Sequence, residues 1–426
     1  MVDNESGRLR AVAWLELLPW LCLFRTFRLA IGIRLLLLSA VAIFITFMGW
    51  SVIGWVFSND LDVAQRVKAL GDCPWLSITE MVADEPGLPQ IPRLDGSLPN
   101  LPATNPVWGS WKQLSQPFFD IFRWNVTKSF LAYALLCGLW VLAVWAFFGG
   151  AITRTVAVQL ARDERIGWLP MIRHAVGKWR AYFAAPLFPL AGVLAAMIPI
   201  AFLGLFLRLN LGVFLAALVW PLALLGGLVM AVLLLGLIFG WPLMWATIGT
   251  EGTDSFDALS RSYAYVFQRP LHYLFYVLVA GLFGALGWLL VSNFAAAVVL
   301  LTYWAASWTA GWQGGAPRID VVIKGAEGLD MIGSAGAALI RFWVACVKLL
   351  AVGFLYSYFW TASTAIYFLL RRDVDATEVD EVSLDEEEDE QLYGLPPLET
   401  DEEGAPVVSD DLPEDADADA DLQDEE

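Results

Sequence analysis

Two long apolar runs flank one polar segment, and this pattern restricts the fold more than any motif does. The polar segment extends from Gly249 to His272 and reads GTEGTDSFDALSRSYAYVFQRPLH. About 20 consecutive apolar residues are enough for a helix to cross the hydrocarbon core of a bilayer. We therefore predict membrane-spanning helices on both sides of this segment, which we call the island.

The composition agrees with a membrane protein. Hydrophobic residues make up 58% of the 426-residue chain, above the roughly 45–50% that is usual in soluble domains. The formal net charge of −18 combines two unlike parts. No Lys or Arg follows Arg372, whereas residues 373–426 are rich in Asp and Glu. We expect a mildly basic membrane body followed by a strongly acidic tail.

The four cysteines show no metal-ligand spacing. Cys22, Cys137 and Cys346 fall in or beside apolar segments, which predicts reduced, buried thiols. Cys73 lies in a segment that we expect outside the cytoplasm, where an intermolecular disulfide is an open alternative. The sequence indicates no cofactor and no metal site.

The region of residues 1–34 combines arginines with a short apolar stretch from Ala11 to Phe24. This stretch is too short to span a bilayer, so we predict an interfacial helix on the basic side of the membrane. The first span is predicted at residues 35–57. Residues 58–127 then form an extracytoplasmic loop, and apolar residues at helical spacing from Val107 to Phe122 predict an amphipathic helix on the outer leaflet surface.

Residues 128–372 are predicted to form the rest of the bundle, with the second span from Lys128 to Ile152. The connection after it is rich in arginine, which marks that side as cytoplasmic. Apolar residues at helical spacing from Trp168 to Trp179 predict a surface helix with a basic face, which anionic headgroups would attract. Spans three and four are predicted at about 183–207 and 211–245.

Prolines interrupt spans three and four, among them Pro189, Pro199, Pro221 and Pro242. Each removes a backbone donor, so neighbouring helices must compensate for the lost hydrogen bond. Kinked helices can line a transport path, and they also occur in structural bundles. We favour the structural interpretation.

Inside the island, Thr253 or Asp254 is placed to cap a helix whose apolar residues share one face. Asp257 and Arg261 stand four residues apart, which predicts a surface ion pair. These two residues and Tyr263 are our candidates for a docking surface on the cytoplasmic side.

The island also repeats the order of the preceding cytoplasmic connection. In both places a span leads to a surface helix, then to an aromatic residue, Tyr182 or Tyr273, and then to the next span. We interpret this order as an internal repeat.

The apolar run from Leu271 to Trp312 leaves two alternatives. It crosses once as a long tilted helix, or twice, which would reverse the topology of everything after it. Gly281, Gly284 and Gly287 give this run a small-residue face that suits close helix packing.

The last span is predicted at residues 349–370 and ends in Arg371 and Arg372. Arg341 and Lys348 occupy one face of its approach. Ionisable residues inside a membrane are functional candidates by default, although these two can also extend to the outer interface.

Residues 373–426 are predicted to be a disordered acidic tail, because so few apolar residues cannot form a core. The segment LYGLPPL, from Leu392 to Leu398, contains Tyr393 and is a candidate docking motif for a soluble partner. A spacer is the alternative interpretation. Both termini are predicted to be cytoplasmic.

The short motifs Asp257-Ala258-Leu259 and Ser262-Tyr263, followed by an aromatic-rich start of a span, resemble those of bacterial six-helix integral membrane proteins of unknown function. They are also similar to the membrane domain attached to some glycerophosphodiester phosphodiesterases. The resemblance covers roughly Phe130 to Leu370 and implies a membrane-embedded scaffold with chemistry elsewhere. We find no phosphodiesterase domain in the sequence, so this activity is not expected.

Catalytic motifs are missing from the sequence. The only histidines are His174 and His272, so there is no HExxH pattern, and there is no GxxxxGK[ST] phosphate-binding loop. Asp60-Leu61-Asp62 has the carboxylate spacing of some glycosyltransferases but lacks their accompanying domain. We expect no enzymatic activity and no nucleic-acid binding.

We therefore predict an all-α, polytopic transmembrane helix bundle of about six spans with amphipathic interfacial helices and a disordered acidic C-terminal tail. The predicted function is that of a membrane scaffold or accessory subunit in the cell membrane, which recruits a cytoplasmic protein partner. The alternative is a transporter or permease for a small or apolar solute, including lipid. Spans three and four offer almost no polar groups for a polar substrate. The oligomeric state is left open.

Overall fold

The computed structural model describes residues 18–70, 105–123, 126–313, 316–319, 322 and 329–377. The chain divides into two compact units, Met1–Val382 and Ser383–Glu426, and all described residues belong to the first. Six helical segments in the described part are long and apolar enough to cross a membrane. The predicted fold class, an all-α multi-pass bundle, is confirmed.

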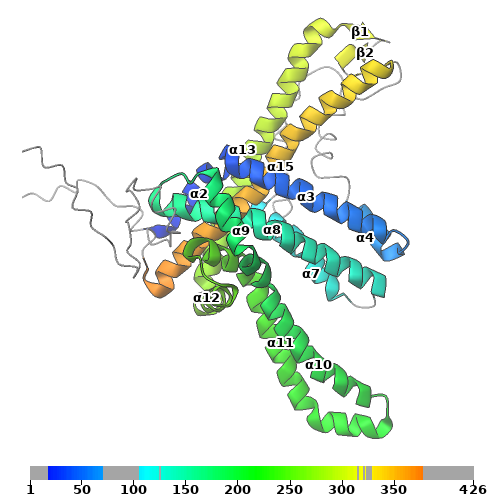
Figure 1. The fold of residues 1–426 in the computed structure, drawn as a ribbon, viewed down its shortest axis with the longest axis vertical. Helices are drawn as coiled ribbons and strands as arrows, with labels where there is room; N and C mark the ends of the chain where they lie inside the picture. The colour runs from blue at the N-terminus through cyan, green and yellow to red at the C-terminus, as the bar shows by residue number, and fades with distance from the viewer. Residues whose placement is uncertain are drawn as a thin grey trace, which may run out of the picture. The chain divides into compact units, whose positions relative to one another are not determined.

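The spanning helices are α3 (Ile33–Val56), α8 (Lys128–Arg162), α10 (Leu187–Phe206), α11 (Asn210–Glu251), α13 (Pro270–Ala310) and α15 (Met331–Asp375). Figure 1 also labels the shorter helices α2 (Cys22–Ala30), α4 (Leu61–Leu70), α7 (Pro106–Ile121), α9 (Trp168–Ala184) and α12 (Ser255–Gln268). The 3-10 turn η1 (Pro19–Leu21) precedes α2. Between α13 and α15, two-residue strands β1 (Trp312–Gln313) and β2 (Ala316–Pro317) pair antiparallel.

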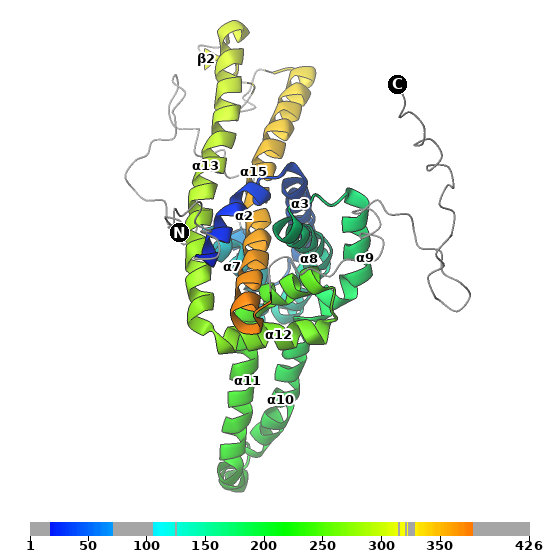
Figure 2. The ribbon, with the colours of Figure 1, turned by 90° about the vertical axis from the view of Figure 1, so that its left-hand side faces the viewer.

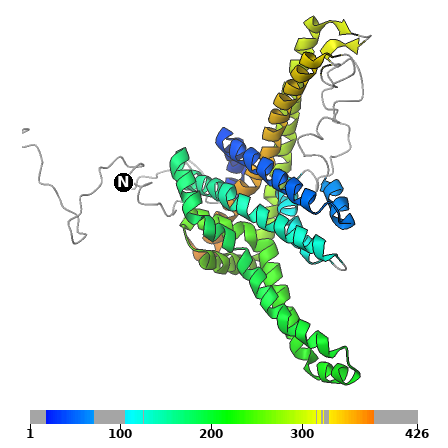
Figure 3. The same ribbon diagram turned by 45° about the vertical axis from the view of Figure 1, so that its right-hand side comes forward.

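The six spans pack as three neighbouring pairs, α3 with α8, α10 with α11, and α13 with α15. Helix α15 is central, because it also contacts α3, α8 and α11, and its residues 351–371 are almost all buried. Helices α10 and α11 lie side by side (Figure 3) and expose large apolar side chains such as Phe214 and Leu218 along most of their length. Such an apolar surface is suited to contact with lipid.

Three of the spans are about twice as long as one bilayer crossing needs. Helices α11, α13 and α15 contain 42, 41 and 45 residues. At 1.5 Å per residue each measures about 60 Å or more, roughly twice the hydrocarbon thickness. These helices must therefore tilt in the membrane or extend beyond its apolar core.

The run from Leu271 to Trp312 is one continuous helix up to Ala310, which confirms the single-helix alternative. The buried residues of α13 include Gly281, Gly284 and Gly287, so the predicted small-residue packing face is also confirmed. A Cβ atom at Gly284 would lie 2.4 Å from the ring of Tyr358. The absence of a side chain at this position lets α13 and α15 approach each other.

The predicted last span lies inside a longer helix. Helix α15 begins at Met331, where the Asp330 carboxylate accepts a hydrogen bond from Gly333 N at 2.7 Å and caps the helix, and it contains the predicted span 349–370. No proline follows to interrupt it. Arg341 and Lys348 consequently lie within the helix and not in a separate approach segment.

The predicted amphipathic helix at Val107–Phe122 exists as α7 and is packed against the bundle, whereas its place on the outer leaflet surface stays a prediction. Helix α7 packs against α8, α13 and α15, and the indole of Trp111 donates a hydrogen bond to the Ile238 carbonyl of α11 at 3.0 Å. An amphipathic pattern records only that one face is more polar. The pattern is the same whether the polar face contacts the headgroup layer or a polar cavity between helices.

The predicted interfacial helix at Ala11–Phe24 is only partly within the described residues, which begin at residue 18. From Pro19 on, η1 leads into α2, and α2 contacts α13 and α15. The hydroxyl of Ser357 donates to the Ala30 carbonyl at 2.8 Å at the end of α2. This helix is thus attached to the bundle itself.

Candidate functional site

Polar side chains gather where α8, α11 and α15 end, beside α9 and α12; we call these helix ends, together with α9 and α12, the base. Helix α12 contacts α11, α13 and α15, and Figure 2 shows it beside the end of α15. The residues that follow the three helices, Asp163, Gly252 and Ala376, all have left-handed backbone angles, with φ of 57°, 63° and 55°. This conformation ends a helix sharply, so each chain segment turns at the base.

The island forms α12 as predicted. Of the two cap candidates, Asp254 caps the helix, since its carboxylate accepts from the backbone N of Phe256 at 3.1 Å and of Asp257 at 2.9 Å. The buried face of α12 includes Tyr265 and Val266. The predicted order of span, surface helix and next span recurs as α8–α9–α10 and α11–α12–α13.

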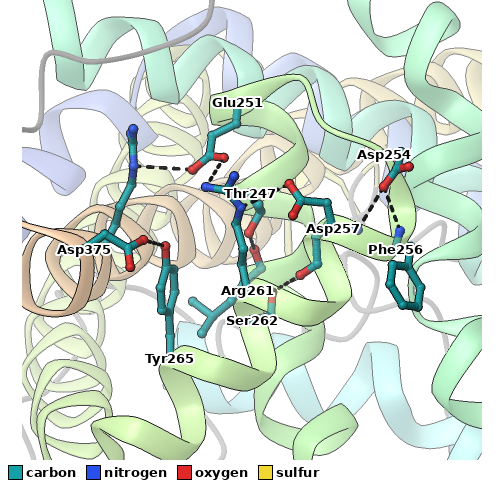
Figure 4. A network of polar contacts seen from close by, with 12 residues as sticks. Thr247, Glu251, Asp254, Phe256, Asp257, Arg261, Ser262, Tyr265 and Asp375 are labelled. Carbon is teal, nitrogen blue, oxygen red and sulfur yellow. Dashed lines mark hydrogen bonds and ion pairs between the residues drawn. The ribbon is translucent and has the colours of Figure 1, made fainter. Parts of the chain in front are cut away.

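Glu251, the last residue of α11, is the centre of the polar contacts (Figure 4). Its carboxylate lies 2.5 Å from Nη1 of Arg261 in α12 and 3.4 Å from Nε of Arg371 in α15. The hydroxyl of Tyr367 donates to the same carboxylate at 2.5 Å. The side chains of Glu251 and Arg371 are 11% and 10% exposed. This carboxylate therefore joins three helices in a setting where it is largely shielded from water.

Arg261 has two acidic partners. It forms the predicted pair with Asp257, at 3.1 Å between Nε and Oδ2, and it also contacts Glu251 of α11. Partial burial lowers the pKa of Arg261, but the neighbouring carboxylates Glu251 and Asp257 raise it more, so its pKa lies above the usual value. The guanidinium thus stays charged and holds α12 against the end of α11.

Two tyrosines tie the last turn of α15 to its neighbours. Tyr265 of α12 donates to the carboxylate of Asp375, and Tyr276 of α13 donates to that of Asp373 at 2.7 Å. Burial and the hydrogen bond to Asp375 raise the pKa of Tyr265 above its usual value. This hydroxyl therefore stays protonated and remains a donor.

A second group of contacts joins α8 and α9 to the last turn of α11. Arg154 of α8 is fully buried, and its Nη1 donates to the Gly249 carbonyl at 3.3 Å. Lys178 of α9 donates to the Gly252 carbonyl. Cations at the C-terminus of a helix are stabilised by its partial negative charge. Two helices therefore contribute positive groups to the same helix end.

The other predicted docking residues do not join this network. The hydroxyl of Tyr263 donates to the Leu233 carbonyl at 2.5 Å, and its ring packs over Gly236; burial raises its pKa to about 12. On α15, Arg341 is exposed and Lys348 is 9% exposed, and neither contacts the base residues named above. Tyr393 lies outside the described residues.

Most residues of the network were missed as site candidates, among them Glu251, Arg154 and Arg371. The sequence does carry one signal, an acidic residue directly after a long apolar run at Glu251. The partners of Glu251 could not be predicted from their spacing in the sequence, because they lie on other helices. Arg154 was expected among the exposed basic residues of a connection and is instead buried.

Among the described residues, no three His, Cys, Asp or Glu side chains are grouped so that they could hold a metal ion. Cys22, Cys137 and Cys346 are free thiols, as predicted, but only Cys137 is buried, and Cys22 and Cys346 are partly exposed. Burial raises the pKa of Cys22 to about 12. Cys73 lies outside the described residues. The contacts at the base are ion pairs and hydrogen bonds between helices. Such an arrangement suits a structural joint.

Comparison with known proteins gives no relative for this chain. No family model, no curated protein and no solved structure matches it. The functional assignment therefore rests on the geometry alone.

Proposed function

We propose that this multi-pass membrane protein acts as a membrane scaffold or accessory subunit of the cell membrane, with the base on the cytoplasmic side. The observation that carries this proposal is the junction at Glu251, where α11, α12 and α15 are held together by ion pairs. The carboxylate of Glu251 is occupied by three protein donors. A carboxylate that is bound in this way is better suited to hold helices together than to take part in a reaction.

The surface of the base suits contact with a partner. On α12, Phe256 is 68% exposed. On α9, exposed apolar side chains such as Leu169 and Val176 alternate with the exposed Arg173. In the proposal, α9 rests on anionic headgroups, and α12 faces a soluble protein. The acidic residues 378–426 follow the end of α15 in sequence and would add to the recruitment.

Site-specific photo-cross-linking tests this role. A benzophenone amino acid at Phe256 is expected to give a discrete protein adduct in intact cells, and the adduct should weaken when the chain is ended after Thr377. The matched control is Phe214, which is 71% exposed on α11 and should react with lipid only. If Phe256 gave no protein adduct, or one that was unchanged without the tail, the recruitment proposal would fail.

A permease for a small or apolar solute, including lipid, is the second candidate, and one observation favours it. A cavity of about 480 Å³ lies between α7 and the spans α3, α8 and α15, and we call it the polar cavity for the charged and amide side chains in its mixed lining. Next to it, a Cβ atom at Gly281 would lie 2.9 Å from Nδ2 of Asn105, the cap of α7. A cavity enclosed by spanning helices is where a transported solute would bind.

A further inference from the structure

We propose that the two cavities on opposite faces of α7 form one binding site for an anionic phospholipid, with the phosphate group in the polar cavity and an acyl chain in the apolar one. The inference does not depend on the scaffold role, since α7 lies apart from the Glu251 junction. It rests on the chemistry of the two cavities and on their positions one after the other along α8.

Among the described residues that line it, the polar cavity carries one more positive than negative charge. Its charged residues are Arg66, Lys112 and Asp120. Arg66 pairs with Asp120 at 2.9 Å between Nε and Oδ2, whereas Lys112 forms no ion pair with another described residue. The uncompensated ammonium group of Lys112 favours an anion in this cavity.

Hydrogen-bonding groups accompany this charge. The side-chain carbonyl of Gln113 accepts a hydrogen bond from the Tyr356 hydroxyl at 2.8 Å. The side-chain NH₂ of Gln113 is therefore left on the cavity wall as a donor. The hydroxyl of Ser110 belongs to the same wall, is buried, and has no hydrogen-bond partner among the described residues. A buried hydroxyl without a partner costs free energy. A bound phosphate oxygen would remove that cost after a small rotation of the side chain.

The opposite face of α7 borders an apolar cavity of about 310 Å³. Its walls include Leu114 and Phe118 of α7, Trp145 of α8, and Leu237 and Trp241 of α11. Phe119 and Phe122 also line it and are exposed, so the cavity reaches the outside of the helix bundle. An acyl chain entering from the bilayer fits a cavity with this lining.

The two cavities follow one another along the same face of α8. Ala134 and Cys137 line the polar cavity, and Val141 and Trp145, one and two turns further on, line the apolar one. The ring of Tyr356, in the polar cavity, stacks on that of Trp145 at 5.1 Å between centroids. Between them, the ring of Phe118 packs on Gly138, where a Cβ atom would lie 3.2 Å from it, so this ring must turn for one lipid to occupy both cavities. In a phospholipid, one glycerol unit joins the headgroup to the acyl chains. The order of headgroup and acyl chain therefore matches the order of the polar and the apolar cavity along α8.

The test is a thermal-shift titration of the full-length protein purified in a neutral detergent. Short-chain phosphatidylglycerol should raise the unfolding midpoint in a saturable way, and phosphatidylcholine should act only at higher concentration. Inorganic phosphate and diacylglycerol, given separately, distinguish a free-anion site and a purely apolar site from a phospholipid site. If either acts as well as phosphatidylglycerol, the proposal is wrong.

Two substitutions and a control locate the site. Lys112→Glu should raise the half-maximal concentration of phosphatidylglycerol at least tenfold, and Leu237→Trp, which fills the apolar cavity, should do the same. Lys128→Glu changes an exposed lysine at the start of α8 that lines neither cavity, and should have no effect. Because Lys112 is exposed, the first variant should keep the wild-type midpoint without lipid, so it decides the test even if Leu237→Trp does not fold. Equal affinities of Lys112→Glu and Lys128→Glu would overturn the assignment.

Discussion

The variant Glu251→Gln is expected to lower the free energy of unfolding by about 3 kcal/mol, because it leaves two arginines beside a neutral amide. The loss should come mainly from Arg371, whose side chain is 10% exposed and so has little access to water. Arg261 is 39% exposed, and its share is reduced by solvent screening. The measurement is the midpoint of thermal unfolding in a mild detergent.

The matched control for Glu251→Gln is Asp257→Asn, which removes the other acidic partner of Arg261. The Asp257 side chain is 42% exposed and pairs four residues away on the same helix. Such pairs contribute about 0.3–0.5 kcal/mol. If both variants unfolded at the same temperature, Glu251 would not be the joint between the three helices.

A second large loss of stability is expected from a substitution at Gly284. Gly284→Ala should destabilise the protein by about 1–3 kcal/mol, the usual cost of overpacking. The new Cβ atom would lie 2.4 Å from the ring of Tyr358. That ring is fully buried, and its hydroxyl donates to the Ala280 carbonyl at 2.8 Å, so it cannot move aside without losing this bond. We expect the distance between α13 and α15 to increase, because the new Cβ atom and the Tyr358 ring cannot occupy the same space.

Gly227→Ala is the control for this substitution. Gly227 lies in the middle of α11, is exposed, and has no atom within 4 Å of a Cβ placed on it. Since alanine has the higher helix propensity, by about 1 kcal/mol, this variant should be neutral or slightly stabilised. Unfolding midpoints that moved in the same direction for both variants would contradict the proposed packing role of Gly284.

The spanning helices could be predicted from the sequence because length and hydropathy alone decide whether a segment crosses a bilayer. Helix α3 was expected at 35–57 and runs from Ile33 to Val56. Contacts within one helix could also be predicted. The Asp257–Arg261 ion pair depends only on four-residue spacing, and it is present. Such features need no knowledge of the other helices.

The parts that could not be predicted depend on which helices become neighbours. Helix α7 has the pattern of a surface helix, yet its contacts are with α8, α13 and α15. Arg154 looked like one more basic loop residue and is buried against the Gly249 carbonyl. The same holds for the partners of Glu251, which come from α12 and α15. Hydropathy does not distinguish burial in protein from burial in lipid, and spacing carries no information on contacts across the bundle.

Six spans would place the base on the cytoplasmic side of the membrane, and cysteine labelling from each side decides whether they do. In a cysteine-free background, single cysteines would replace the exposed residues Ser260 in α12, Asn59 after α3, and Asn210 at the turn between α10 and α11. We predict that a membrane-impermeant maleimide labels Asn59→Cys and Asn210→Cys from outside intact cells, and Ser260→Cys only after the cells are opened. Labelling of Ser260→Cys from outside, or of all three positions from the same side, would contradict the account.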